Sequence, residues 1–228
     1  MGYNTFGQDV PFPSAPGSAT PGPMPGQLRL TDGSIIEVKD ISDRPIFDTE
    51  LILDPIVAGT DYFFFRNIAW PNGLRKDFRF TNMTIPNQLP SGWKARVYGV
   101  HLYVIPILDT AGVITLTTPE DVQRITYNAF CQFLTSSDKV EIEGTMEMFP
   151  SPYGLTGMGM FAGAALHEVS QINNGVPSPG ALGPMKPTID LVNEMIFGMR
   201  VVFPGACNLD NPCMLKCVLR TWTAKPVT

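Results

Sequence analysis

The stretch MIFGMRVVF, residues 195–203, decides the fold class of this chain. Every second residue in it is large and apolar: Phe197, Met199, Val201 and Phe203. A period of two predicts a β-strand with one face on a core. The segment from Leu215 to Leu219 repeats the pattern, and the Pro- and Asn-rich stretch 204–212 connects the two. The pattern therefore predicts two closing strands joined by this connection.

Similar signals recur toward the N-terminus. An Asp-Gly pair at 32–33 between alternating runs predicts a hairpin over residues 27–39. The remaining expected strands, all rich in alternating or β-forming residues, are 49–57, 62–65, 77–81, 93–108 and 140–148.

One segment carries helix signals. Thr118 resembles an N-cap, Pro119 suits the first helical position, and two acids follow in the first turn. Apolar residues at three-to-four spacing then predict a helix that ends near Ser136, although Ile125 and Phe133 also favour a strand there.

About eight strands without regular strand–helix alternation predict an all-β fold. We expect an antiparallel jelly-roll sandwich with long loops and one short helix, formed as a single domain over residues 27–228. A length of 228 residues would also accommodate two smaller domains.

Residues 1–26 differ from the rest, because prolines alternate with glycines and small residues. Such a segment cannot bury a core and is expected to be extended. It is either a disordered tail or an arm that lies along a neighbouring subunit. Tyr3, Phe6 and Phe12 favour the arm, since aromatic side chains can anchor in a groove.

The charge composition limits the classes of function. Only 16% of residues are charged, which leaves little repulsion between copies, and the net charge of −5 argues against strong nucleic-acid binding. A group of basic residues is interpreted as a solvated rim rather than a phosphate-binding patch: Arg66, Arg75, Lys76, Arg79, Lys94 and Arg96.

No arrangement typical of catalysis, cofactor binding or metal binding stands out, so we expect a protein that is not an enzyme. His101 lies within an expected strand and His167 within a Gly- and Met-rich stretch, where packing or solvation explains each. Cys207 and Cys213 bracket a turn-rich loop and could form a disulfide if oxidised. Reduced, buried thiols are the favoured interpretation of all four cysteines, because the N-terminus lacks the features of a secretory signal. No apolar run is long enough to cross a bilayer, so no transmembrane segment is expected.

The layout resembles the jelly-roll capsid proteins of small tailless icosahedral bacteriophages. Four features carry the resemblance: the proline-rich arm, the stretch 80–92 leading into the long strand 93–105, the Gly/Pro/Met-rich excursion 150–187, and the closing strands 195–203 and 214–222. Many members of that group carry two jelly rolls per chain, whereas this chain has room for one. That difference leaves open a minor capsid protein, paired subunits, or a vertex or spike component.

The resemblance implies a structural virion protein, a capsid subunit that builds an icosahedral shell in the host cytoplasm through loop, edge and arm contacts. Its partners would be copies of itself, with other capsid proteins or an internal lipid layer as further candidates. The alternative is a carbohydrate- or receptor-binding β-sandwich module of a phage fibre, spike or adhesin. In that module the aromatic residues Trp70, Trp93 and Tyr153 could stack on sugars.

Overall fold

The computed structural model describes residues 27–30, 33, 35–37, 41–52, 55–105, 107–108, 114–115, 118–136, 139–149, 188–192 and 195–224. The chain divides into two compact units, Met1–Ile41 and Ser42–Thr228. The predicted arm, residues 1–26 with Tyr3, Phe6 and Phe12, lies outside the described residues.

The described part of the first unit is a hairpin. β1 (Gln27–Arg29) pairs antiparallel with β2 (Ile35–Glu37). Gly33 in the turn has a φ of 82° and donates its N–H to the Leu30 carbonyl at 3.0 Å. Glycine adopts this left-handed conformation without a steric penalty, so the Asp-Gly signal predicted the hairpin correctly.

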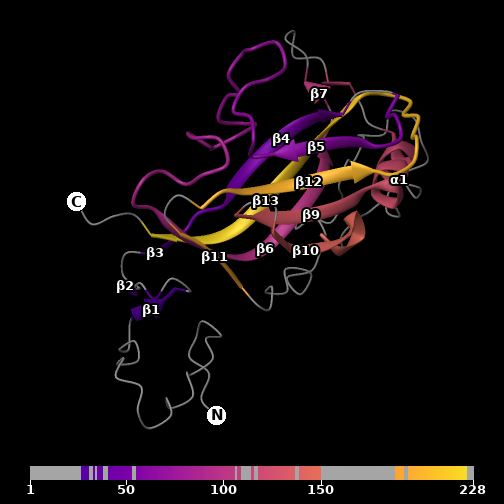
Figure 1. Cartoon of the computed structure of the whole chain (residues 1–228). Coiled ribbons are helices and arrows are strands. Elements are labelled where there is room, and N and C mark those ends of the chain that lie inside the picture. Colours follow the sequence, from indigo (N-terminus) through magenta and orange to yellow (C-terminus); the bar gives the residue numbers. More distant parts are fainter. Residues whose placement is uncertain are drawn as a thin grey trace, which may run out of the picture. The chain divides into compact units, whose positions relative to one another are not determined.

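The second unit is built from two antiparallel sheets that pack against each other (Figure 1). The first sheet has the order β11-β6-β13 and continues to β3 (Ile41–Asp43) and β4 (Ile46–Ile52), which both pair with β13. Its other strands are β6 (Lys94–Ile105), β11 (Ile189–Leu191) and β13 (Cys213–Ala224). The second sheet has the order β10-β9-β12-β5. Its strands are β5 (Thr60–Phe64), β9 (Phe130–Thr135), β10 (Lys139–Thr145) and β12 (Phe197–Phe203).

The strands of this sandwich pair as a nested series. β4 pairs with β13, β5 with β12, β6 with β11, and β9 with β10. The first half of the series is therefore matched, in reverse order, by the second half. β13 and β12 lie inside their sheets, since β13 also pairs with β6 and β12 with β9.

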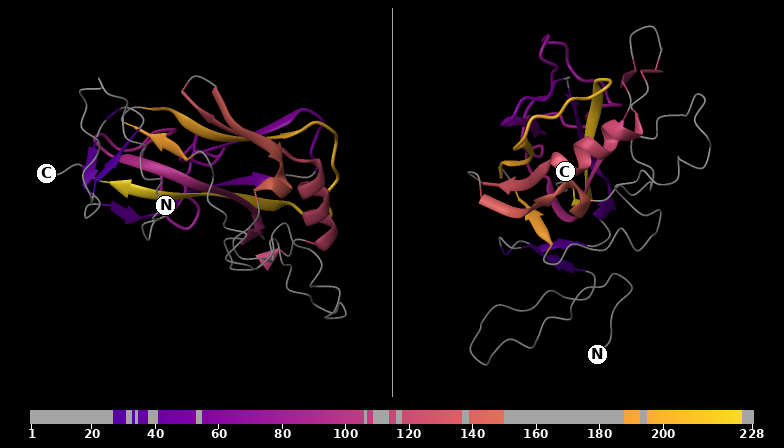
Figure 2. Two further views of the ribbon diagram at one scale, coloured as in Figure 1. Left: turned by 90° about the horizontal axis from the view of Figure 1, so that it is seen from below. Right: turned by 90° about the vertical axis from the view of Figure 1, so that its right-hand side faces the viewer.

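The remaining short elements lie between these strands. β7 (Ile107–Leu108) pairs with β8 (Ile114–Thr115), and a single 3-10 turn, η2, covers Met146–Met148. The helix α1 (Pro119–Asn128) lies at one end of the sandwich, as the views of Figure 2 show.

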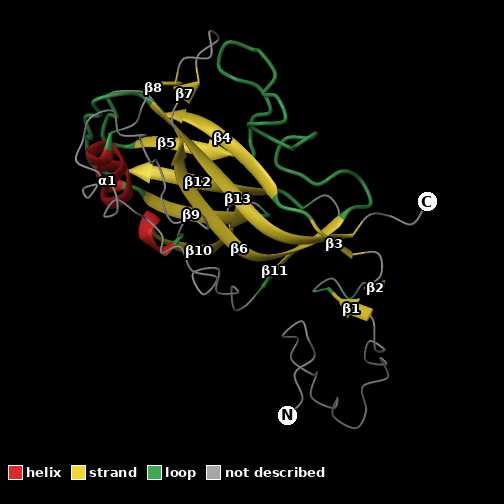
Figure 3. Ribbon diagram, turned by 180° about the vertical axis from the view of Figure 1, so that it is seen from behind, coloured by secondary structure: helices red, strands yellow, loops and turns green. Residues whose placement is uncertain are grey.

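The core lies between the sheets. On β12 the exposure alternates strictly, and Phe197, Met199, Val201 and Phe203 are all within 1% of full burial. The opposite sheet contributes another set of fully buried side chains: Ile52, Leu102, Cys213, Leu215, Cys217 and Leu219. The all-β sandwich expected from the alternation is confirmed, and α1 is the one α-helix among the described residues (Figure 3).

Three local expectations were wrong. The helix ends at Asn128, and Phe133 lies instead in β9, because residues 130–135 pair with strands on both sides. Residues 77–81 form a turn rather than a strand, and Phe78 is 81% exposed. Strand β10 stops at Thr145, so Met146 and Met148 belong to η2 and do not share its alternation.

Candidate functional site

The most unusual chemistry in the described residues is a buried group of charges beside β4. Asp48 and Glu50 share the inward phase of β4 with Ile46 and Ile52, and their register partners on β13 are Cys217 and Leu215. Both carboxylates therefore point into the space between the sheets, and Asp48 is fully buried. A buried carboxylate is costly unless it is paired or hydrogen-bonded.

Lys76 supplies the pairing. It comes from the long connection between β5 and β6, and its side chain is fully buried. Its Nζ lies 3.1 and 3.3 Å from the two oxygens of Asp48 and 2.6 Å from Oε1 of Glu50. The Trp70 ring, with its centroid 5.1 Å from Nζ, adds a cation–π contact.

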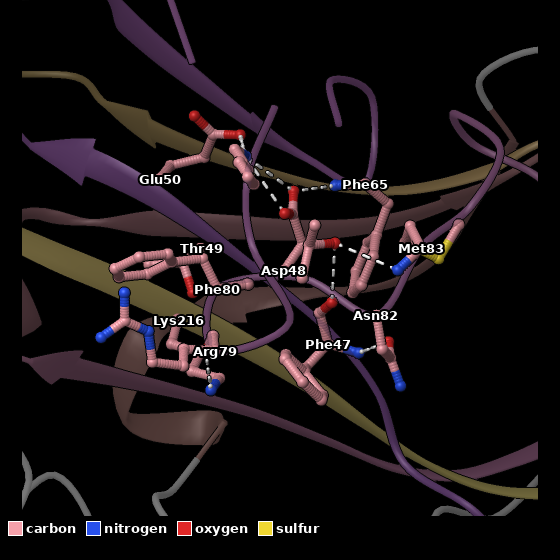
Figure 4. A network of polar contacts seen from close by, with 12 residues as sticks. Phe47, Asp48, Thr49, Glu50, Phe65, Arg79, Phe80, Asn82, Met83 and Lys216 are labelled. Carbon is pink, nitrogen blue, oxygen red and sulfur yellow. Dashed lines mark hydrogen bonds and ion pairs between the residues drawn. The ribbon is translucent and has the colours of Figure 1, made fainter. Parts of the chain in front are cut away.

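A backbone donor completes the group. The Phe65 N–H donates to Oδ2 of Asp48 at 2.7 Å, as Figure 4 shows. Phe65 has a φ of 68°, which a bulky residue rarely adopts. The chain turns there at the end of β5, and this conformation directs the N–H at the carboxylate.

Burial and charge act in opposite directions on the two carboxyl groups. Desolvation raises the pKa of Asp48 above its usual range, although Lys76 and the Phe65 hydrogen bond oppose the change. Desolvation likewise raises the pKa of Glu50 to about 7, against the opposing charge of Lys76. Desolvation raises the two pKa values more than the charge of Lys76 lowers them, because the ionised carboxylates lose their hydration on burial.

The same connection covers the outer edge of β4. Asn82 Oδ1 accepts the Phe47 N–H at 2.9 Å, and Asn82 Nδ2 donates to the Pro45 carbonyl at 2.7 Å. Thr49 Oγ1 donates to the Phe80 carbonyl at 2.9 Å. Polar groups of an edge strand that would otherwise be open to another chain are thus occupied within the molecule (Figure 4).

A second polar cluster fastens the β12–β13 loop to α1. Asp121, fully buried, accepts the backbone N–H groups of Asp210 and Asn211 at 2.7 and 3.1 Å. Arg124 contacts Asp121 at 3.3 Å and Asp210 at 3.1 Å. Because every group has a partner, this arrangement serves to position the loop.

A third set of polar side chains forms a row across the second sheet. Arg200 on β12 donates to Asp61 of β5 at 2.6 Å and to Gln132 of β9 at 3.3 Å, and Gln132 donates to Glu143 of β10 at 3.0 Å. Such cross-strand pairs stabilise a sheet face, and this row ties all four strands together.

Of the residues singled out in the sequence, the structure brings Lys76 and Trp70 into the buried charge group. Cys207 and Cys213 are not joined by a disulfide, and all four cysteines are buried. Burial raises the pKa of the Cys131 and Cys213 thiols to about 12, so these thiols are un-ionised at neutral pH. His101 is buried in β6, whereas His167 lies outside the described residues.

The solvated rim predicted for the basic residues was wrong for Lys76, which is only 4% exposed. Asp48 and Glu50 were not among the residues expected to form a site. Both acids occur at the same parity as Ile46 and Ile52, but the predicted strand began at residue 49, so Asp48 lay outside it. Charges in phase with core residues indicate buried charges that need a partner.

Within the described ranges, no group of three or more His, Cys, Asp and Glu side chains is placed to hold a metal ion. None of the helices in the described part of the chain is long and apolar enough to cross a membrane. No protein-family model, curated protein or solved structure matches the chain. The fold therefore defines the class, an antiparallel all-β sandwich.

Proposed function

We propose that this protein is a jelly-roll structural subunit that assembles with copies of itself, as the capsid proteins it resembles do. The observation that carries the proposal is the nested pairing of eight of the nine described sandwich strands, β4 with β13 through β9 with β10. A jelly roll is a long antiparallel ribbon rolled up in this way, and it occurs in viral capsid domains as well as in lectin domains.

Surface chemistry supports the same role. The low charge of 16% reduces repulsion between neighbouring copies. β10 forms one end of its sheet, and an edge of this kind can pair with another copy. The net charge of −5 favours contact with other capsid proteins or a lipid layer over direct contact with a genome. The proposed location is the virion, with assembly in the host cytoplasm.

The test is negative-stain electron microscopy of the full-length protein across protein concentration and salt, together with sedimentation velocity. We expect closed shells or regular rings that become more abundant with concentration. A monodisperse monomer under all conditions, including in the presence of anionic vesicles, would count against the proposal.

The glycan-binding alternative has less support from its aromatic residues. Trp70 packs edge-on against Phe80 with centroids 5.2 Å apart, and Arg44 lies over the Trp93 ring at 5.3 Å. Tyr153 lies outside the described residues. A monomer that binds a defined oligosaccharide in a glycan screen would favour this alternative.

A further inference from the structure

We propose that Lys76 and Asp48 become joined by an intramolecular amide bond between Lys76 Nζ and Asp48 Cγ, with Glu50 as the acid–base group. The cluster brings together an amine, a carboxyl group and a second carboxyl group in a site closed to solvent. This inference concerns the chemistry of the chain itself and does not depend on the proposed function.

The geometry places the reacting atoms in contact. Nζ lies nearly equidistant from the two Asp48 oxygens, at 3.1 and 3.3 Å, so it faces the carboxyl group as a whole. Glu50 Oε1 lies 2.6 Å from the same nitrogen and can take a proton from it. Holding the partners at this separation removes most of the entropic cost of their encounter.

The Phe65 N–H is placed to assist. It donates to Asp48 Oδ2 at 2.7 Å and would stabilise the negative charge that develops on that oxygen when nitrogen attacks the carbon (Figure 4). Phe65 therefore acts through its backbone, so replacing its side chain leaves the donor in place.

Burial favours the uncharged forms that the reaction needs. Lys76 and Asp48 have side chains with no exposure to solvent, and the side chain of Glu50 is 16% exposed. Transfer of one proton from the ammonium to the Asp48 carboxylate gives a neutral amine and a neutral acid. The raised pKa of Asp48 is in keeping with that transfer.

The bond changes balance without any further reagent. The lone pair of Nζ attacks Cγ of the protonated Asp48, and the Glu50 carboxylate takes a proton from the nitrogen. Glu50 then returns that proton to the departing hydroxyl group, which leaves as water while the C=O bond re-forms. The products are one amide, one water molecule and the original Glu50 carboxylate.

The product suits the site better than the ion pair. A buried ion pair carries a desolvation cost that its mutual attraction offsets only in part. The amide replaces both charges, and its carbonyl can still accept the Phe65 N–H while its N–H can donate to Glu50. The bond would also fasten the β5–β6 connection to β4 across 28 positions of sequence.

The experiment is mass spectrometry of the denatured full-length protein, followed by tandem analysis of a tryptic digest. We expect an intact mass below that of the sequence by one water molecule. We also expect a branched peptide joining the segment with Asp48 to the segment with Lys76. A folded protein that keeps its full mass and cleaves normally after Lys76 would overturn the proposal.

Variants locate the bond and assign the role of Glu50. Lys76→Arg keeps the positive charge but cannot form the amide, so its mass should match its sequence. Glu50→Gln should also keep its full mass while circular dichroism shows a folded β-protein. Lys139→Arg is the matched control, because Lys139 contacts Glu141 at 2.8 Å on the surface and should leave the water loss unchanged.

Asp48→Asn gives the sharpest outcome. Its reaction would release ammonia in place of water, and the product would be chemically identical to that of the original chain. The two reacted proteins should therefore have equal masses. Water loss that persists in Lys76→Arg would overturn the assignment to this lysine, and unchanged reaction in Glu50→Gln would overturn the role of Glu50.

Discussion

Glu50 makes the stability of the folded chain depend on pH, with a sign that is unusual for a carboxyl group. Its pKa is raised from 4.5 to about 7 in the folded chain, so between these values the folded state holds more protons than the unfolded state. Stability then falls as pH rises through this window. Asp48, whose pKa is also raised, acts in the same direction as long as its carboxyl group has not formed the amide.

We expect Glu50→Gln to flatten the dependence of unfolding midpoint on pH between about 5 and 7, as measured by urea denaturation. The slope is the readout, because the substitution also changes absolute stability. Glu143→Gln, on an exposed position of β10, is the control and should retain the original slope. Equal slopes in all three proteins would contradict the account of Glu50.

Two phenylalanines, one buried and one exposed, should respond differently to truncation. Phe133 is fully buried in β9, so Phe133→Ala should destabilise the fold by about 3–5 kcal/mol through lost burial and a cavity. Phe78 is 81% exposed, so Phe78→Ala should change stability by less than about 0.5 kcal/mol. A large loss of stability for Phe78→Ala in chemical denaturation would show that Phe78 packs in the core, as a strand over residues 77–81 would require.

At the scale of elements, α1 and the β12–β13 loop depend on one carboxylate. Asp121→Ala would leave the N–H groups of Asp210 and Asn211 without their acceptor, and we expect a loss of about 2–4 kcal/mol in the free energy of unfolding. Glu120→Ala, in the same helical turn but exposed, is the matched control. Similar losses in the two variants would show that the effect belongs to the helix and not to the loop contact.

The elements that the sequence predicted well are those with local signals. Thr118 accepts the Asp121 N–H at 3.1 Å, as its N-cap signal implied, and the strict alternation of β12 matches its burial. The end of α1 was missed because apolar spacing at Ile125, Ala129 and Phe133 fits a helix locally. Pairing of β9 with strands distant in sequence decided otherwise.

The candidate site could not be assembled from the sequence for the same reason. Asp48 and Lys76 are 28 positions apart, and only the course of the β5–β6 connection brings them together. Lys76 lies among other basic residues, which made a solvated rim the natural interpretation. Parity within β4 could have indicated that Asp48 and Glu50 point inward, but no local pattern indicates which basic residue pairs with them.

For the whole molecule, the arm provides the test that links fold to assembly. We expect deletion of residues 1–26 to leave the melting temperature within a few degrees and to weaken assembly. The expectation rests on a composition that cannot contribute a core. Calorimetry and electron microscopy of the same preparation would measure the two effects. A collapse in melting temperature would show that the segment belongs to the folded domain.

The nested pairing has a consequence for how the chain reaches its fold. β13, the last of the described strands in chain order, lies between β6 and β4 inside its sheet. The first sheet therefore cannot close during synthesis until β13 has left the ribosome. Contacts between such distant segments give a high contact order, and folding on the millisecond-to-second scale is expected. Until β13 arrives, β4 and β6 have open edges in the nascent chain, so chaperone capture during synthesis would be strongest for this protein just before β13 emerges.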